Sequence, residues 1–306
     1  MIIQIPEFKK IGENTTPNNV LNITICLLEY KINQLCKQHT NNNIDDIDGF
    51  ACQIAKKMVK SMRTLLAVCN RDKDYAVASS IIRMLADNMA TFKLIYCQNE
   101  QNEKTYRHYL YILDGVSSRV KLLPETILND GKITKDEYAE LSKQINDIRN
   151  SDLKAIEHCE QFLNSHRYAT EHPEFHAQTI KNKNWKYKTL SCTSNPNQNK
   201  YSWSEFYQLI DNRADIQSFI SSHLSQFVHG LSISNLSLCE TEEDFYPIVS
   251  FGICIGGELL NELKILFNND DEIYADFFKS PQFLEMLCNY SKEYIQENIL
   301  DPLNIK

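Results

Sequence analysis

The stretch KDYAVASSIIRMLADNMATFKLIYC, residues 73–97, decides the fold class of this chain. Its large apolar residues recur at steps of three and four, the spacing that places side chains on one face of an α-helix. This stripe consists of Ala78, Ile81, Leu85, Met89, Phe92 and Tyr96. The other side is also apolar but small, with Ala76, Ser79, Ala86, Ala90, Leu94 and Cys97. A helix that is apolar all round is buried, so the pattern predicts a central helix that its neighbours approach closely.

Similar spacing recurs on both sides of this stretch and predicts further helices. Two of their starts carry capping signals, Thr16 before Pro17 and the capping box Thr134–Glu137. The expected helices run from Pro17 to about His39, from about Asp45 to Cys69, over 73–97, around 106–120, over 134–163, over 204–229, from Thr241 onward, and from Pro281 to about Leu300. Only eight glycines and eight prolines occur, and no alternating strand pattern. The chain is therefore predicted to be an all-α, multi-helix bundle.

The helical pattern stops between residues 167 and 200, where Asn, Lys, Ser, Thr and His predominate. A loop of this length inside a compact domain is usually functional or disordered, and Trp185 and Tyr187 indicate that part of this one packs down. Residues 1–15 are expected to form a loosely attached N-terminal arm. No linker is evident elsewhere, so residues 16–306 are predicted to form a single α-helical domain with a long central loop over 167–200.

Charge and cysteine content limit the functions and cellular locations that the chain can have. Forty acidic and 32 basic residues give a net charge of −8. This argues against an extended DNA-binding surface, because such surfaces are basic, but leaves open a local site for RNA or a nucleotide. The ten cysteines stand singly, without a CxxC pair, which suits a reducing compartment. The N-terminus lacks a signal-peptide pattern, and the most apolar stretch, 245–260, is short for a membrane span and contains Glu258. We therefore expect a cytoplasmic protein without membrane contact.

The first candidate for chemistry is the pair Arg83 and Asp87, which lie four residues apart on the small-residue side of the central helix. A buried arginine is costly unless a carboxylate or a ligand pairs with it. The pair is therefore either a site for an anionic group or a structural ion pair that fixes the register of the bundle. No phosphate-binding loop, dinucleotide-binding glycine motif, nucleophile elbow or kinase motif occurs. No cofactor is expected, and the ordinary kinase, dehydrogenase and hydrolase classes are excluded.

A second candidate is a polar stripe near the end of the helix expected over 204–229. Its members are spaced by four, three and four residues, which places them on one face: Ser218, Ser222, Ser225 and His229. The carbonyl end of a helix favours imidazolium, so a general acid–base or phosphate-facing role would suit this histidine. Alternatively, it ends a solvated serine face. His223 projects to the apolar side instead, where we expect a satisfied core histidine.

Histidines also gather before and within the expected loop, at His158, His166, His172 and His176. The last two have the i, i+4 spacing of some zinc-binding helices. The HExxH pattern is missing and no third ligand is evident, so no metal site is predicted. Arg167 and His172 match a loose R-x4–6-H pattern, which chance readily supplies in a chain with eight arginines and eight histidines.

Two segments together resemble a known family. Residues 82–87 read IRMLAD, an R-x-L-x-[DE] helix, and residues 224–230 read LSQFVHG, an LSxxVH-type helix. This combination is similar to a family of uncharacterised bacterial proteins, the DUF5677 type, which resemble HEPN-like helical bundles. The match spans roughly residues 50–265.

The resemblance implies an α-helical bundle that is often a homodimer. Many such proteins are metal-independent endoribonucleases in toxin–antitoxin or phage-defence systems, and others are inactive and bind nucleotides or partners. If the chain is an active member, our hypothesis is that His229 is the acid–base and that Arg83 stabilises phosphate charge, provided that the two helices pack together. Ser225 and Asp87 would orient these two residues.

In active members four to six residues separate an arginine from the histidine that follows it, and no arginine precedes His229 or His223 at that spacing. The literal match, Arg167 with His172, lies in the expected loop. Arg167, His172 and His223 are therefore secondary candidates. Two functions follow as expectations: an RNA- or nucleotide-targeting effector, or a catalytically inactive helical binding or scaffold protein for a nucleotide or protein partner.

Overall fold

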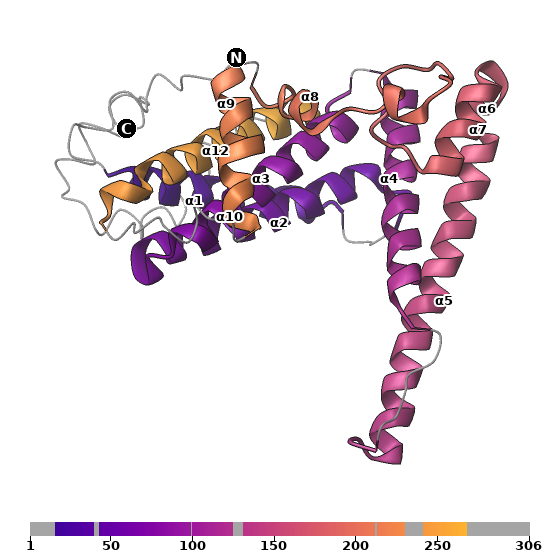
Figure 1. Ribbon diagram of the computed structural model, residues 1–306, viewed down its shortest axis with the longest axis horizontal. Coiled ribbons are helices and arrows are strands. Elements are labelled where there is room, and N and C mark those ends of the chain that lie inside the picture. The colour runs from indigo at the N-terminus through magenta and orange to yellow at the C-terminus, as the bar shows by residue number, and fades with distance from the viewer. Residues whose placement is uncertain are drawn as a thin grey trace. The chain divides into compact units, whose positions relative to one another are not determined.

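A computed structural model describes residues 16–39, 43–98, 100–124, 131–211, 213–229 and 241–267 of the chain. Within these ranges the secondary structure is helical apart from one isolated bridge, Tyr187–Lys200, which confirms the all-α prediction (Figure 1). The arm at 1–15 and the helix expected from Pro281 lie outside the described residues. Contacts between Cα atoms divide the chain, expected to be a single domain over 16–306, into two compact units. We describe each by itself.

Unit 1 contains the predicted central helix. Its helices come from both ends of the chain: α1 (Pro17–Cys36), α2 (Ile47–Ala67), α3 (Tyr75–Tyr96), α8 (Trp203–Tyr207), α9 (Ala214–Ser218), α10 (Leu224–Val228) and α12 (Tyr246–Phe267). π-helical turns follow α2 (η2, Val68–Asp72) and join α9 to α10 (η4, Phe219–His223), and a 3-10 turn, η5 (Glu243–Phe245), precedes α12. The helix expected over 204–229 is thus several short pieces, since the chain turns at 208–211 and widens at η4.

The central position of α3 is confirmed. Most residues of both predicted stripes are buried, and Leu85, Ala86 and Ala90 have no exposed surface, whereas Val77 and Met84 are exposed. It packs against α10, α12 and α8. α12 in turn lies on α1, where a Cβ added at Gly256 would stand 2.6 Å from the Thr24 Cγ2 atom. The absence of a side chain at Gly256 therefore permits the close packing of these two helices.

Unit 2 is formed by residues 43–47 and 98–202. Its helices are α4 (Gln101–Leu122), α5 (Lys135–Ser165), α6 (Arg167–Glu171) and α7 (Pro173–Asn182), followed by a 3-10 turn, η3 (Pro196–Asn199). α4 and α5 form a helical hairpin. The capping box at the start of α5 is present as predicted, with both Thr134 and Glu137 bonding each other's backbone.

The long loop predicted over 167–200 needs a correction. Its first half is helical, as α6 and α7, and only residues 183–200 lack a long helix. These helices have five and ten residues, too few for the apolar period to repeat. Their apolar side is also unusual, because Tyr168, Phe175 and His176 bury aromatic surface against Tyr106 of α4.

Candidate functional site

The Arg83 and Asp87 pair is present in α3, with Nε of Arg83 3.4 Å from Oδ1 of Asp87. The arginine side chain is only 14% exposed. Its guanidinium lies over the rings of Tyr207 and Trp203, at 4.7 and 5.7 Å from their centroids. The Tyr207 hydroxyl donates a 2.6 Å hydrogen bond to Asp87. Burial, together with this bond, raises the pKa of Tyr207 far above its usual range, so the phenol stays protonated as a donor.

Arg83 also donates a 2.5 Å hydrogen bond from Nη1 to the carbonyl oxygen of Ile220. Ile220 lies in the π-turn η4, where the Leu224 N–H bonds the Phe219 carbonyl five residues back. A π-turn widens the helix and displaces carbonyl groups from the usual i→i−4 pattern, which leaves one for Arg83. The guanidinium is therefore held by a carboxylate, a carbonyl and two aromatic faces, all from unit 1.

His229 is exposed at the C-terminal cap of α10, with its backbone N–H bonded to the Ser225 carbonyl. Ser225 is half-buried on the preceding turn. His223 faces the other way, stacked on Phe219 at 5.2 Å and edge-on to Phe227 at 5.1 Å. Its predicted position on the apolar side of the helix therefore agrees with the structure, and it lies with these rings rather than with His229.

The structure does not bring Arg83 and His229 together. Arg83 contacts Ile220, which lies nine residues before His229. Nine residues correspond to a distance of about 13 Å along a helix axis. The two helices run antiparallel, because Phe227 contacts Tyr75 at the start of α3, at 5.2 Å between ring centroids. His229 therefore lies toward the beginning of α3, two turns away from Arg83. A phosphate could not touch both side chains in this arrangement.

Arg167 and His172 belong to unit 2. Arg167 pairs with Glu171 at 3.1 Å and with Glu100 at 3.9 Å, so two carboxylates already balance its charge. His172 joins α6 to α7 and meets the Tyr168 ring edge-on at 5.7 Å. Neither arrangement leaves an arginine available to a phosphate beside a histidine.

Two further histidines of unit 2, His166 and His176, pack in its core. His176 Nδ1 lies 3.0 Å from the Tyr106 hydroxyl, and the His166 ring lies 4.9 Å from the Tyr106 ring. His158 instead pairs with Asp45 at 2.6 Å. Burial lowers the pKa of His166 and of His176. Among the residues that the structure describes, no three His, Cys, Asp or Glu side chains gather as metal ligands.

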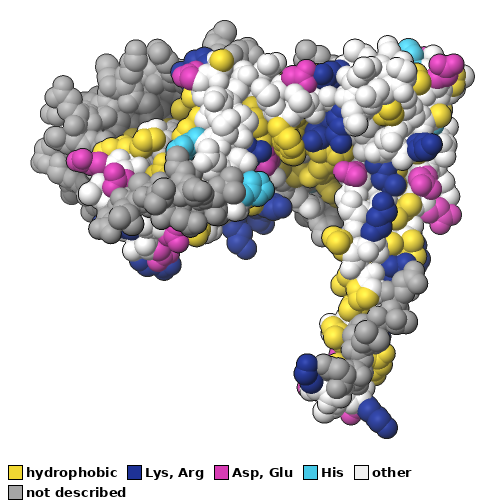
Figure 2. Space-filling model, viewed as in Figure 1, with side chains coloured by type: hydrophobic (Ala, Val, Ile, Leu, Met, Phe, Trp, Pro, Cys, Tyr) yellow, Lys and Arg dark blue, Asp and Glu magenta, His cyan; other side chains and the backbone are white. Residues whose placement is uncertain are grey.

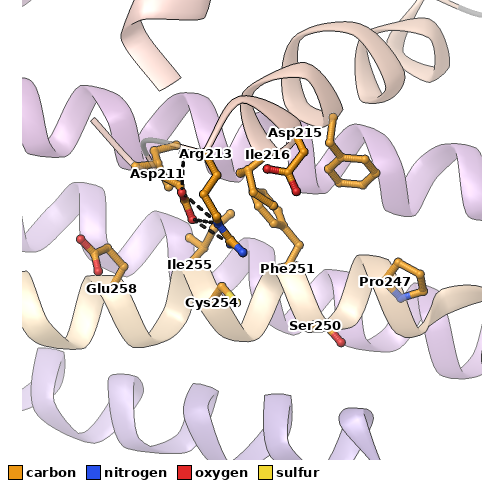
Figure 3. A pocket seen from close by; sticks show the side chains of 12 residues that line it. Asp211, Arg213, Asp215, Ile216, Pro247, Ser250, Phe251, Cys254, Ile255 and Glu258 are labelled. Carbon is orange, nitrogen blue, oxygen red and sulfur yellow. Dashed lines mark hydrogen bonds and ion pairs between the residues drawn. The ribbon is translucent and has the colours of Figure 1, made fainter. Parts of the chain in front are cut away.

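A pocket of about 380 Å³ opens in unit 1 between α12 on one side and α9, with the turn that precedes it, on the other (Figure 3). Its apolar lining includes Ile216, Phe219, Phe251 and Ile255. Figure 3 shows the Arg213 side chain pointing toward Cys254, with ion-pair lines to Asp211. The volume falls within the range of pockets that hold small ligands or single anchoring side chains.

Acidic groups predominate among the charged residues of this pocket. Arg213 pairs with Asp211 at 2.9 Å and holds the pKa of that carboxyl below its ordinary value. Glu258 pairs with Lys93 of α3. The remaining charged residue, Asp215, is exposed, so it leaves the rim with a net negative charge. Desolvation by its neighbours raises the pKa of the Cys254 thiol, although the residue is exposed at the pocket, so the thiol stays in the poorly nucleophilic protonated form.

Sequence reasoning missed this pocket. Phe219 and Phe251 stand 32 residues apart on separate helices, and no local pattern pairs them. The available signal was Asp211-x-Arg213 followed by Asp215, a dense charge cluster directly before an apolar stripe. Such a cluster suits the charged rim of an apolar site.

Comparison with protein-family models, with curated proteins and with solved structures found no match to this chain. None of the helices described has an apolar stretch long enough to cross a lipid bilayer. The site is therefore interpreted from its own geometry.

Proposed function

We propose that this protein is a catalytically inactive helical binding protein, and that the pocket between α9 and α12 receives an apolar group bearing positive charge. The lining of the pocket carries this proposal. Phenylalanine and isoleucine side chains form its walls, the rim is acidic, and its one thiol is protonated. Such a lining offers binding energy and orientation but no activated nucleophile.

The geometry around Arg83 favours this alternative over the ribonuclease. An arginine that stabilises a phosphate must offer its N–H donors to the ligand. Arg83 instead bonds Ile220 and pairs with Asp87. A HEPN-like protein that binds a partner without cleaving RNA is consistent with this arrangement, and we retain that family assignment as part of the proposal.

Charge selects among ligands for the pocket. A nucleotide would bring phosphates beside Asp211, Asp215 and Glu258, and the single pocket arginine is already paired. A leucine or phenylalanine anchor flanked by lysine or arginine would meet apolar walls and an acidic rim. Amphipathic peptide helices bind grooves through anchors of this kind. The proposed partner is therefore a basic, amphipathic protein segment.

Fluorescence anisotropy of a labelled helical peptide with leucine anchors and lysine flanks tests the proposal. The full chain should bind it, and a matched peptide with glutamate flanks should bind at least tenfold more weakly. Ser250→Trp, which fills the pocket from an exposed position, and Asp215→Lys should each weaken binding about tenfold or more. Ser151→Trp and Glu160→Lys, exposed positions of α5, are the matched controls and should bind as the wild type does. Equal binding of both peptides, or no effect of Ser250→Trp, would contradict the assignment.

A second assay decides between binding and cleavage. The purified protein with EDTA is incubated with single-stranded RNA and tRNA, beside Arg83→Ala and His229→Ala. We expect no cleavage by any of the three. Cleavage by the wild type that is lost in His229→Ala would establish the ribonuclease instead.

A further inference from the structure

Arg213 is the one basic residue among the described residues that line the pocket of unit 1. Its Nε donates to both carboxylate oxygens of Asp211 at 3.1 Å, and its Nη2 donates to Oδ2 at 2.9 Å. Two nitrogens of the guanidinium thus meet both oxygens of one carboxylate, which is the bidentate geometry that arginine forms and lysine does not. Figure 3 shows this pair among the side chains that line the pocket. The pocket therefore contains a guanidinium site that a residue of the chain itself fills.

The arginine of this pair is only loosely held. The Arg213 side chain is 57% exposed, whereas that of Asp211 is 16% exposed. Figure 2 shows side chains of both signs at the surface near the start of α9. An ion pair with one partner mostly in water contributes little stability, because water competes for the exposed charge. A stronger cationic ligand can therefore displace Arg213 from Asp211 at little cost in free energy.

Asp211 keeps its position without the guanidinium of Arg213. Its Oδ1 also accepts a 2.8 Å hydrogen bond from the backbone N–H of Arg213, and its backbone carbonyl accepts one of 3.1 Å from Gln217. Both bonds come from groups that remain when the arginine side chain moves away. The carboxylate is thus preorganised for a second guanidinium, and preorganisation lowers the entropic cost of binding.

The charge balance of the rim favours one further cation. Asp211 and Asp215 carry two negative charges and Arg213 one positive charge, so the three sum to −1, while Glu258 is paired with Lys93. The pKa of Arg213 is raised first by its hydrogen bond to Asp211 and also by the charge of Asp215, which shows that all three groups interact. A ligand with one positive charge would bring this rim to neutrality, whereas an anion would make it more negative.

We propose that Arg213 holds the place of an arginine of the bound partner, which displaces it and takes over the carboxylate of Asp211. Asp211 is then the residue that determines specificity. Its two oxygens match the paired donors of a guanidinium, whereas an ammonium group donates from a single nitrogen. This inference rests on the proposed function, and it narrows the partner from a basic amphipathic segment to one that carries arginine beside its apolar anchor.

Two labelled helical peptides with the same leucine anchors, one flanked by arginine and the other by lysine, test the inference by fluorescence anisotropy with the full chain. The wild type should bind the arginine peptide about fivefold or more tightly than the lysine peptide. Asp211→Asn should bring this ratio close to one, since asparagine keeps an oxygen for the Arg213 N–H but loses the charged carboxylate. Asp215→Asn is the matched control. It should weaken both peptides alike and leave the ratio unchanged.

Arg213→Ala tests the displacement itself. It should tighten binding of the arginine peptide about threefold or more beyond any gain of the lysine peptide, because the lysine peptide measures the general effect of removing a positive charge. Circular dichroism of each variant establishes that the helices persist.

The outcomes separate this inference from the proposed function. Equal affinity of the wild type for both peptides would overturn the inference and leave the proposed function standing. Weaker binding of the arginine peptide by Arg213→Ala would also overturn it, since Arg213 would then support the ligand rather than compete with it. If neither peptide binds the wild type, the proposed function fails and this inference fails with it.

Discussion

At the scale of single residues, Arg83 is a charge of unit 1 that several neighbours hold in place. Its side chain is 14% exposed and makes one hydrogen bond, one ion pair and two aromatic contacts. Arg83→Ala removes the cation and leaves the Ile220 carbonyl without this donor. We expect a loss of about 2–4 kcal/mol in the free energy of unfolding, measured by urea denaturation. Arg71→Ala is the control, because Arg71 is 78% exposed and its loss should leave the urea midpoint unchanged. Equal midpoints for both variants would contradict a structural role for Arg83.

Alanine substitutions at two adjacent glycines of α12 should have opposite effects on stability. A Cβ at Gly256 would stand 2.6 Å from Thr24 Cγ2, whereas a Cβ at Gly257 would meet nothing within 4 Å. Gly256→Ala should therefore cost about 1–3 kcal/mol through overpacking. Gly257→Ala should stabilise by about 0.5–1 kcal/mol, since alanine favours the helix. Thermal unfolding of the two variants checks the direction of each stability change. A Gly256→Ala variant as stable as the wild type would show that α1 and α12 can move apart at little cost in free energy.

The residues differ in how far the sequence predicted them. The Arg83–Asp87 pair follows from i, i+4 spacing alone, and the structure contains it. Tyr207 and Ile220 stand more than 120 positions away from Arg83, so no local sequence pattern predicts their contacts with it. The pairing of Arg83 with His229 failed for a geometric reason, because Arg83 meets the helix at Ile220, two turns too early.

At the scale of elements, the α4–α5 hairpin depends on an ion pair at an apolar position. Asp152 is 3% exposed and accepts two bonds from Arg119, of 2.6 and 2.5 Å. Arg119→Leu alone should destabilise the hairpin by about 2 kcal/mol or more, since it leaves a buried carboxylate unpaired. Arg119→Leu with Asp152→Leu should recover most of that loss.

A double-mutant cycle in urea measures this coupling, with Lys121→Leu, an exposed position of α4, as the control for added surface leucine. Additive effects of the two hairpin substitutions would contradict the direct coupling.

Elements with a long apolar period or a capping box were predictable, as α3 and the start of α5 show. Those shorter than about three turns were not, because fewer than three apolar repeats do not define a face. No sequence pattern predicted the π-turn η4 either, yet this turn supplies the carbonyl group that accepts a hydrogen bond from Arg83.

At the scale of the whole molecule, the chain passes through unit 2 at residues 43–47, leaves unit 1 again after α3 and returns at α8. None of these crossings is rich in proline or glycine, which explains why the sequence indicated no boundary. The division has a practical consequence: Trp203 belongs to unit 1 and Trp185 to unit 2. Single-tryptophan variants therefore report on each unit separately.

Unit 2 should lose stability in mild acid. Burial lowers the pKa of His108, His166 and His176 in the folded chain, so below the unfolded value of about 6.5 the unfolded chain binds more protons. The stabilisation is complete above that pH and declines as the pH falls toward the folded pKa values. Trp185 fluorescence, followed in urea from pH 7.5 to 5 in Trp203→Phe, should show a falling midpoint. His166→Asn with His176→Gln should flatten the decline, because two of the three groups no longer titrate. An unchanged slope in that variant would show that protonation of this core does not govern the acid sensitivity of unit 2.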